Sequence, residues 1–379
     1  MRIGINATFA SERHNGTTTF VDGILRCLRA HGHEALVYSS SERYALLEGV
    51  TLRKTPASLA DGRGSATMRR FAWMQACLPR RLKRDGVELF FAPNVEALLW
   101  SPVPQIVTVH DLIPLFYPAE SPRQRHYYKY VLPHILRASL RTLVVSQHTR
   151  RDVIQQYGLD AGRVNVVYNS LREDLLDDSV GAKPEGLGSC PYFLFVGTFS
   201  PRKNLETVIR AFARTHSEVP EKLVVVAYPD RWQDSIRRLA KELGVLQKVE
   251  FYSGLKNAEL KFLYRNATAL FLLSEYEGFG YPPLEAMASG TPAIVSDSTS
   301  LAEVVGDAGI QLFHRDADGA AVAMRRLSGD STYRDTFRDK GKLRAGQFRW
   351  LNRMEQIGQV LISPLNQTAL HSCPLGVAE

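Results

Sequence analysis

The sequence predicts an α/β fold made of two doubly wound, Rossmann-like domains, and three observations support this. The chain has 379 residues, which exceeds the size at which a single hydrophobic core usually stops growing. Short apolar runs alternate with stretches of helical periodicity, the pattern of a parallel sheet covered by helices. The alternation is interrupted at residues 171–191, where Asp, Gly and Pro are frequent, so this segment is the expected linker. We therefore expect two domains that face each other across a central cleft.

The apolar runs set the expected order of elements. In the first half the expected strands are residues 3–5, 35–38, 89–91, 106–109 and 143–145, with a helix over 20–30. In the second half they are 192–196, 223–227, 249–251, 269–272 and 293–295, with a helix around 333–345. This order predicts an N-terminal domain over 1–180, a C-terminal domain over 181–349 and a mobile tail over 363–379.

Cysteine usage and hydropathy narrow the class of protein. The four cysteines lack paired spacing, which argues against a disulfide framework and against a zinc site: Cys27, Cys77, Cys190 and Cys373. Residues 1–7 have the pattern of a buried strand rather than of a signal peptide, and no apolar run approaches about 20 residues. We expect a cytoplasmic protein that is soluble or attached peripherally at the inner face of the membrane.

The net charge of +8 is concentrated in the first half of the chain. Residues 1–180 carry 23 basic and 17 acidic side chains, an excess of +6, and the remainder carries 24 and 22, an excess of +2. Residues 69–84 combine basic side chains with Phe71, Trp73, Met74 and Leu78. This stretch is either a helix that binds an anionic membrane surface or an amphipathic helix with its apolar side in the core. Nucleic acid is a poorer explanation of the charge, because no nucleic-acid-binding motif accompanies it.

The segment EGFGYPPLE, from Glu277 to Glu285, is the most informative motif of the chain. Gly278 and Gly280 allow the backbone to approach a ligand closely, and the two prolines favour the start of a helix. A helix start attracts phosphate, and the two carboxylates can accept hydrogen bonds from ribose or sugar hydroxyls. The alternative is an ordinary strand-to-helix turn with solvated acids.

This motif resembles the glutamate-x7-glutamate signature of the retaining glycosyltransferases of family 4, which have the GT-B fold. The likeness is carried by residues 274–297 and by two further motifs, and a weaker likeness covers nearly the whole chain except its C-terminal tail. Residues 195–205 resemble the diphosphate-binding loop of that family, and residues 108–114 resemble its N-terminal histidine strand end. The resemblance also implies a helix over about 350–362 that crosses back onto the first domain.

By this resemblance, the diphosphate loop contributes Gly197, Thr198, Arg202 and Lys203. Arg202 can fork onto two phosphate oxygens and Lys203 adds a compact charge, although a solvated basic pair is the alternative. Many relatives have an arginine where this chain has Thr198, so the role of Arg202 is less firmly implied than that of Lys203. The motif residues Gly278, Phe279 and Gly280 are expected to present backbone amides to the donor.

His110 follows an apolar strand, and the resemblance places it near the donor sugar. A histidine at a strand end can equally be a structural hydrogen-bonding residue, and Asp111 is expected to brace the loop. Gly16 and Thr17 precede the first helix, where a glycine would admit a phosphate or the acceptor. A third region, whose alternative is a plain turn, matches the nucleotide-base contacts of relatives: Tyr252, Ser253 and Leu255.

Together these features predict a retaining glycosyltransferase that uses a nucleoside diphosphate sugar and a glycan or lipid-linked acceptor. The resemblance of the SPRKN segment and the GFGYPP segment to those of relatives favours GDP-mannose over a UDP sugar as the donor. Glu285 would hold the ribose, Glu277 would position the sugar, and the basic pair would neutralise the leaving diphosphate without a metal or other cofactor. The alternatives are a GT-B epimerase or phosphorylase and a non-catalytic nucleotide-sugar-binding protein. A dinucleotide oxidoreductase is disfavoured, because no Gly-x-Gly-x-x-Gly follows the first strand.

Overall fold

The computed structural model describes residues 1–10, 16–60, 66–177, 179–352, 354–355 and 357–361. Its contacts divide the chain into two compact units. Unit 1 comprises Met1–Ser170 together with the residues from Trp350 onward, and unit 2 comprises Leu171–Arg349. The predicted tail over 363–379 lies outside the described residues.

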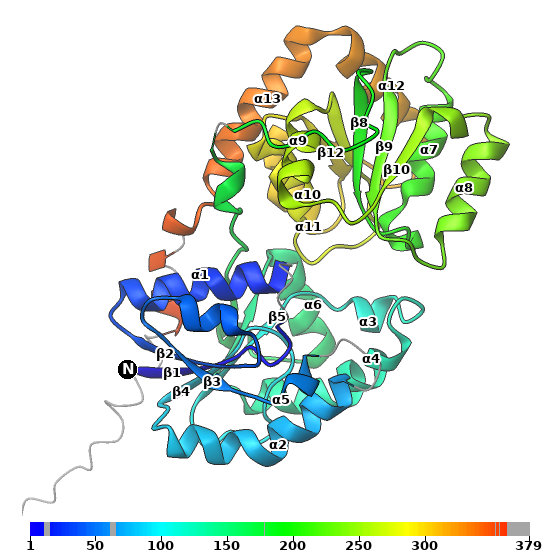
Figure 1. Ribbon diagram of the computed structural model, residues 1–379. Coiled ribbons are helices and arrows are strands. Elements are labelled where there is room, and N and C mark those ends of the chain that lie inside the picture. The colour runs from blue at the N-terminus through cyan, green and yellow to red at the C-terminus, as the bar shows by residue number, and fades with distance from the viewer. Residues whose placement is uncertain (11–15, 61–65, 178, 353, 356, 362–379) are drawn as a thin grey trace, which may run out of the picture. The chain divides into compact units, whose positions relative to one another are not determined.

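Unit 1 contains a parallel sheet in the order β3-β2-β1-β4-β5-β6-β7. Its strands are β1 Arg2–Asn6, β2 Glu34–Ser39, β3 Val50–Lys54, β4 Leu89–Ala92, β5 Gln105–Val109, β6 Arg141–Val144 and β7 Val164–Val166. Its helices are α1 Gly16–Ala30, α2 Ala66–Arg84, α3 Ile113–Phe116, α4 Pro122–His126, α5 Leu132–Ala138 and α6 Gln147–Tyr157. In Figure 1, α1 and α2 lie on opposite faces of this sheet.

Two apolar clusters, one on each face of the sheet, form the core of unit 1. One joins α1 to β1, β2 and β4 and includes Trp350, Ile357 and Leu361 from the C-terminal segment. The other joins α2, α5 and α6 to the opposite face. Trp350, Ile357 and Leu361 therefore belong to the same core as α1, and the Cys27 thiol donates a hydrogen bond to the Met354 carbonyl at 3.1 Å.

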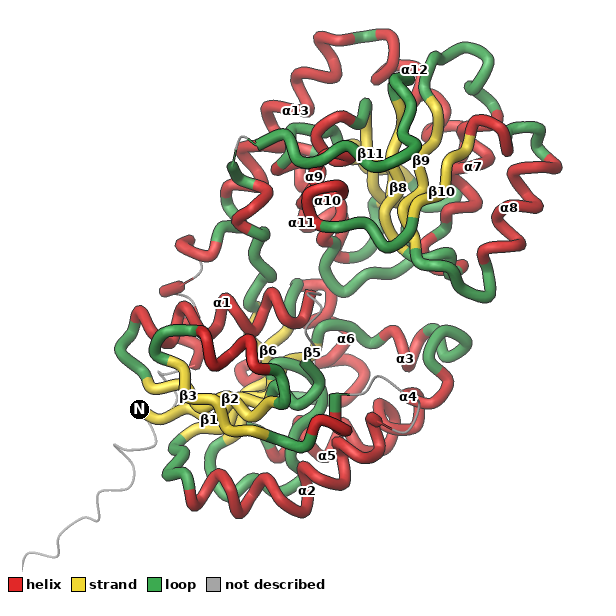
Figure 2. The backbone as a smooth tube through the Cα atoms, viewed as in Figure 1, coloured by secondary structure: helices red, strands yellow, loops and turns green. Residues whose placement is uncertain are grey.

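Unit 2 contains a second parallel sheet in the order β10-β9-β8-β11-β12-β13. Its strands are β8 Tyr192–Gly197, β9 Lys222–Ala227, β10 Val249–Tyr252, β11 Ala269–Leu272, β12 Ala293–Ser296 and β13 Ile310–Leu312. Its helices are α7 Leu205–Ala213, α8 Gln233–Glu242, α9 Asn257–Asn266, α10 Tyr281–Ala288, α11 Ser300–Val305, α12 Ala317–Gly329 and α13 Ser331–Gly346. Figure 2 shows the strands of each unit lying between helices, which confirms the predicted fold class.

The segment expected to be a linker, residues 171–191, is held on α9 of unit 2. Lys261 of α9 is 3% exposed, and its ammonium group donates to the Asp174 carbonyl at 2.6 Å and to the Ser179 hydroxyl at 2.8 Å. Gly181 has a φ of +83°, and a Cβ at this position would lie 2.4 Å from the Ala258 carbonyl. These contacts explain why the division between the units falls after Ser170, earlier than the boundary predicted from composition.

Residues 69–84 belong to the amphipathic helix α2. Met74, Leu78 and Leu82 are buried in the core of unit 1, and the Phe71 ring packs edge-on against Tyr127. The exposed side of α2 carries basic residues, among them Lys83 and Arg84. The apolar side of this helix is therefore used inside the unit. Among the described residues, no helix combines the length and the apolar character that spanning a bilayer requires.

Candidate functional site

The strand order of unit 2 identifies where a ligand should bind. The order reverses between β8 and β11, and ligands of doubly wound sheets bind beyond the carboxyl ends of the strands at such a switch point. The segment after β8 carries Arg202 and Lys203, and the segment after β11 carries Glu277 and the glycines Gly278 and Gly280. The fold thus brings two of the predicted motifs together.

Backbone groups of the segment after β11 bond to the segment after β8. The Glu275 amide donates to the Arg202 carbonyl at 2.8 Å, and the Arg202 guanidinium donates to the Tyr276 carbonyl at 2.5 Å. The Asn204 amide nitrogen donates to the Leu273 carbonyl at 3.0 Å. Arg202 is only 6% exposed, so its side chain braces the two segments in this structure.

Lys203 and Glu277 form an ion pair across the switch point. The Lys203 Nζ lies 2.6 Å from Glu277 Oε1, and the Arg202 Nη1 lies 3.4 Å from Glu277 Oε2. Burial raises the pKa of Glu277, but the charges of Lys203 and Arg202 outweigh burial and lower the pKa below its usual value. Glu277 therefore stays ionised and lies between two cations.

The Gly278–Gly280 turn has a fixed backbone. The Ser300 hydroxyl lies 2.8 Å from the carbonyl oxygens of both Glu277 and Phe279. Gly280 has a φ of +115°, and a Cβ there would lie 2.5 Å from a methyl group of Leu301. Phe279 is buried against the ring of Phe348 at 5.9 Å, so its side chain packs inside unit 2. Helix α10 begins directly after this turn.

Glu285 lies in α10 and has a different environment from Glu277. It is 7% exposed, and its Oε1 lies 3.9 Å from Nη1 of Arg172. Burial raises the pKa of Glu285 and the charge of Arg172 opposes that increase without cancelling it. Neither glutamate of the motif is a solvated surface acid.

His110 in unit 1 lies at the carboxyl end of β5. Its Nε2 lies 2.8 Å from the Pro93 carbonyl, and its ring packs edge-on against Phe20 of α1 at 5.3 Å. Burial lowers the pKa of His110, so the ring is neutral, donates from Nε2 and retains Nδ1 as an acceptor. Asp111 accepts a hydrogen bond from the Ile113 amide at 2.9 Å, which confirms that Asp111 braces the loop.

The remaining predicted residues are distributed over three places. Gly16 and Thr17 form the first turn of α1 in unit 1. Gly197 ends β8, and the exposed Thr198 donates to the Ser200 hydroxyl at 3.1 Å. The predicted base-contact residues lie at the end of the edge strand β10, two strands from the switch point: Tyr252, Ser253 and Leu255.

Three residues that support this arrangement were not predicted from the sequence. Asn204 adopts a left-handed conformation with φ of 54° and ends the short turn that carries Lys203. Ser300 contacts the Gly278–Gly280 turn, and Arg172 faces Glu285. A left-handed Asn before a helix is a recognisable turn signal, whereas nothing local to Ser300 or Arg172 indicates their partners.

Comparison with known protein families matches both units separately. Residues 14–174 match the family model described as Glycosyltransferase Family 4, and residues 183–344 match the model described as Glycosyl transferases group 1. The first match ends four residues beyond Ser170, the last residue before the division between the units, and the second match lies within unit 2.

Two curated relatives are mannosyltransferases by name. The O-antigen chain mannosyltransferase RfbU of Salmonella typhimurium is 34% identical over 201 residues, which are 53% of this chain and 54% of that protein. The O-antigen chain mannosyltransferase B of Escherichia coli is 29% identical over 255 residues, which are 65% of this chain and 67% of that protein. The match therefore spans about half the length of the first relative and two thirds of the second.

Among solved structures, the fold resembles that of Alr3699/HepE from Anabaena in complex with UDP and glucose. The TM-score is 0.73 with 18% identical residues, and the alignment covers 96% of this chain and 100% of that one. This likeness concerns the fold. The family matches and the two parallel sheets show that the chain is built from a family 4 and a group 1 glycosyltransferase domain and has the GT-B fold.

Proposed function

We propose that this protein is a retaining glycosyltransferase that moves a hexose from a nucleoside diphosphate sugar to a hydroxyl group of a glycan or lipid-linked acceptor. Unit 2 binds the donor and unit 1 binds the acceptor. The observation that carries the proposal is the Lys203–Glu277 pair at the switch point of unit 2, next to the Gly278–Gly280 turn. A cation beside a glycine turn at that position suits a diphosphate.

The proposed mechanism is mainly electrostatic. As the bond between sugar and diphosphate breaks, negative charge develops on the phosphate, and Lys203 and the turn amides stabilise it. Arg202 holds the two segments in place and adds positive charge beside Glu277. Lys203 bonds to Glu277 in this structure, so a phosphate that contacts Lys203 would share its ammonium group with that carboxylate.

The two glutamates and His110 take separate roles. Glu277 positions the hydroxyls of the sugar and favours positive charge at its anomeric carbon, and Glu285 accepts hydrogen bonds from the ribose. His110 keeps Nδ1 as an acceptor and is assigned to the donor sugar. Retention follows from a front-face substitution in which a leaving phosphate oxygen helps to deprotonate the acceptor.

GDP-mannose is the favoured donor. Support comes from the names of the two curated relatives, both O-antigen mannosyltransferases, while the UDP complex of the Anabaena protein keeps UDP sugars as the second candidate. The test is to incubate the purified chain with GDP-mannose, UDP-glucose and a dTDP sugar, each together with a mixture of methyl glycosides as hydroxyl acceptors, and to measure the released nucleoside diphosphate. Release from none of the donors would refute the function.

Lys203→Ala should lower kcat/KM for the donor by about a hundredfold, the usual effect of removing one group that stabilises developing negative charge. The matched control is Lys222→Ala. Lys222 forms a similar ion pair with Glu250 at 2.7 Å, but it stands at the amino end of β9, where doubly wound sheets do not bind ligands. Equal donor kinetics for both variants would contradict the assignment of Lys203.

A further inference from the structure

The sheet of unit 1 also has a switch point, between β1 and β4. The segment that follows β4 at this position is residues 93–97, which we term the β4–β5 segment. It forms neither helix nor strand, and it lies beside His110, whose ring bonds to the Pro93 carbonyl. Because the carboxyl end of a switch point is where doubly wound sheets bind ligands, this segment lies where unit 1 should bind one.

Side chains from four separate elements hold the β4–β5 segment. Each donates to a different carbonyl of the segment: His110 to Pro93 at 2.8 Å, Tyr127 to Val95 at 2.6 Å, Asn6 to Glu96 at 2.8 Å and Gln75 to Ala97 at 3.0 Å. An irregular segment would otherwise leave these carbonyls without partners once water is removed. A segment fixed in this way presents its own side chains in one geometry, as a preorganised binding site requires.

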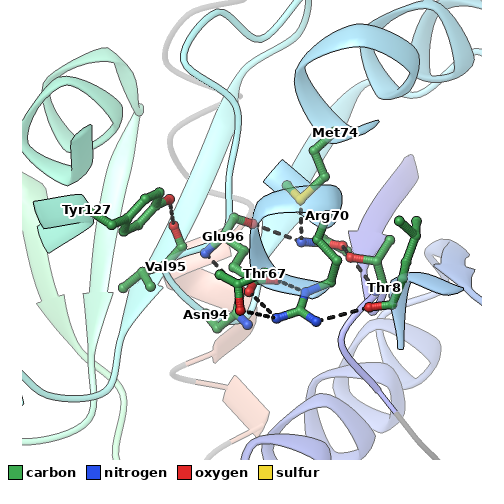
Figure 3. Close-up of polar contacts among 10 residues, drawn as sticks. Thr8, Thr67, Arg70, Met74, Asn94, Val95, Glu96 and Tyr127 are labelled. Atoms are coloured by element: carbon green, nitrogen blue, oxygen red, sulfur yellow. Dashed lines mark hydrogen bonds and ion pairs between the residues drawn. The ribbon is translucent and has the colours of Figure 1, made fainter. Parts of the chain in front are cut away.

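Glu96 is held in place by Arg70 of α2 (Figure 3). The Arg70 Nε donates to Glu96 Oε2 at 2.8 Å and its Nη2 donates to Oε1 at 2.7 Å, a two-pronged contact that fixes the plane of the carboxylate. The side chains are 12% and 16% exposed, so Glu96 retains access to solvent. Each carboxylate oxygen can accept a further hydrogen bond.

The groups left available on this segment suit a sugar. The Oδ1 of Asn94 accepts from the Glu96 amide at 3.0 Å, which leaves the side-chain NH2 as a donor. Glu96 offers acceptor positions on its two carboxylate oxygens. Closely spaced donors and acceptors match the hydroxyl groups of a sugar. A phosphate is disfavoured here, because the carboxylate repels it and both prongs of Arg70 are already occupied.

We propose that the β4–β5 segment binds the acceptor and recognises it as a glycan through its hydroxyl groups. Glu96 and Asn94 contact the sugar, and Arg70 is a positioning residue that acts through Glu96. This proposal rests on the proposed function and adds the chemical class and the location of the acceptor. It predicts that changes at this site weaken acceptor binding and leave donor binding intact.

The test uses methyl glycosides of mannose, glucose, galactose, rhamnose and N-acetylglucosamine as probes. Binding is measured by saturation-transfer NMR, which needs no turnover, with the wild-type chain and with Glu96→Gln and Asn94→Ala. At least one glycoside should bind the wild type. In transfer assays, the KM for that glycoside should rise about tenfold in Glu96→Gln, as expected for the loss of one hydrogen bond to a charged group. The KM for the donor should change less than twofold.

Two further variants separate binding from folding. Glu88→Gln changes an exposed carboxylate at the amino end of β4 and should leave glycoside binding unchanged. Arg70→Lys keeps the charge but loses the two-pronged contact, so it should raise the glycoside KM with little change in kcat. The absence of glycoside binding to the wild type, or equal binding by wild type and Glu96→Gln, would overturn the proposal. Failure to release nucleoside diphosphate would refute the proposed transferase activity. The NMR measurement would still decide whether the β4–β5 segment binds a glycan.

Discussion

At the scale of single residues, the two glutamates of the EGFGYPPLE motif show how position in the fold separates identical side chains. Glu277 lies between two cations, and its pKa is lowered although burial alone would raise it. Glu285 has one arginine at 3.9 Å, burial dominates, and its pKa is raised. Ionised Glu277 therefore stabilises unit 2 at neutral pH, whereas ionisation of Glu285 costs stability.

We predict opposite effects of the two isosteric substitutions on stability. Glu277→Gln should lower the free energy of unfolding by about 2 kcal/mol, because Lys203 and the buried Arg202 lose the carboxylate that lies between them. Glu285→Gln should leave stability within about 1 kcal/mol of the wild type or raise it, because Arg172 keeps its pair with Asp174 at 2.7 Å. Both variants should bind the donor poorly.

The pH dependence tests the same argument. The pKa of Glu277 is lowered in the folded state. Ionised Glu277 therefore contributes its full share to the free energy of unfolding above the unfolded pKa of about 4.3, and this share is lost as the pH falls through the folded pKa. The melting temperatures of wild type and Glu277→Gln, measured by calorimetry, should therefore converge in acid. For Glu285 the wild type should lose stability as the pH rises through the raised pKa, and Glu285→Gln should not. Parallel curves for wild type and both variants would contradict these electrostatic assignments.

At the scale of elements, local pattern predicted the central strands and missed three others. The missed strands β3, β7 and β13 stand at sheet edges. An edge strand has one neighbour and is partly solvated, so it lacks the continuous apolar run of a buried parallel strand. Helix α1 was expected over 20–30 and begins earlier, at Gly16.

The contact between α1 and Trp350 leads to a prediction about stability. A Cβ on Gly23 would lie 1.7 Å from a ring atom of Trp350, so Gly23→Ala must displace the indole that joins this segment to the core of unit 1. We expect a loss of about 2 kcal/mol in the free energy of unfolding, measured by urea denaturation. Gly346→Ala, at the end of α13, is the matched control, because an added Cβ there would meet no atom within 4 Å, and it should be neutral or slightly stabilising. Equal stability of the two variants would argue against the Trp350 contact.

At the scale of the whole molecule, the excess positive charge lies mainly in the first half of the chain. The apolar side of α2 packs in the core of unit 1, so any attraction to a membrane must come from its exposed basic side. Residues 121–151 add further basic side chains and contain no Asp or Glu. We therefore expect attraction to anionic lipid without insertion of apolar side chains.

This expectation is tested by sedimentation with vesicles. The chain should bind vesicles that contain phosphatidylglycerol in about 50 mM salt, bind neutral vesicles poorly, and be released at about 500 mM salt, where the Debye length is only a few ångströms. Replacing Arg80, Lys83 and Arg84 of α2 by Gln should weaken binding severalfold. Binding that persists in high salt would contradict a purely electrostatic attraction, and the absence of binding would remove the membrane surface as a partner.

The sequence by itself determined the fold class, the central strands and the identity of the motif loops, because apolar periodicity and glycine-rich turns act over a few neighbouring residues. Only the tertiary structure decided which loops meet. Lys203 and Glu277 are 74 positions apart, and Arg172 faces Glu285 from a segment that composition assigned to a linker. Such pairings depend on strand order and helix packing, which join distant parts of the chain. The same holds for Arg70 and Glu96, whose contact exists because α2 packs beside the carboxyl end of β4.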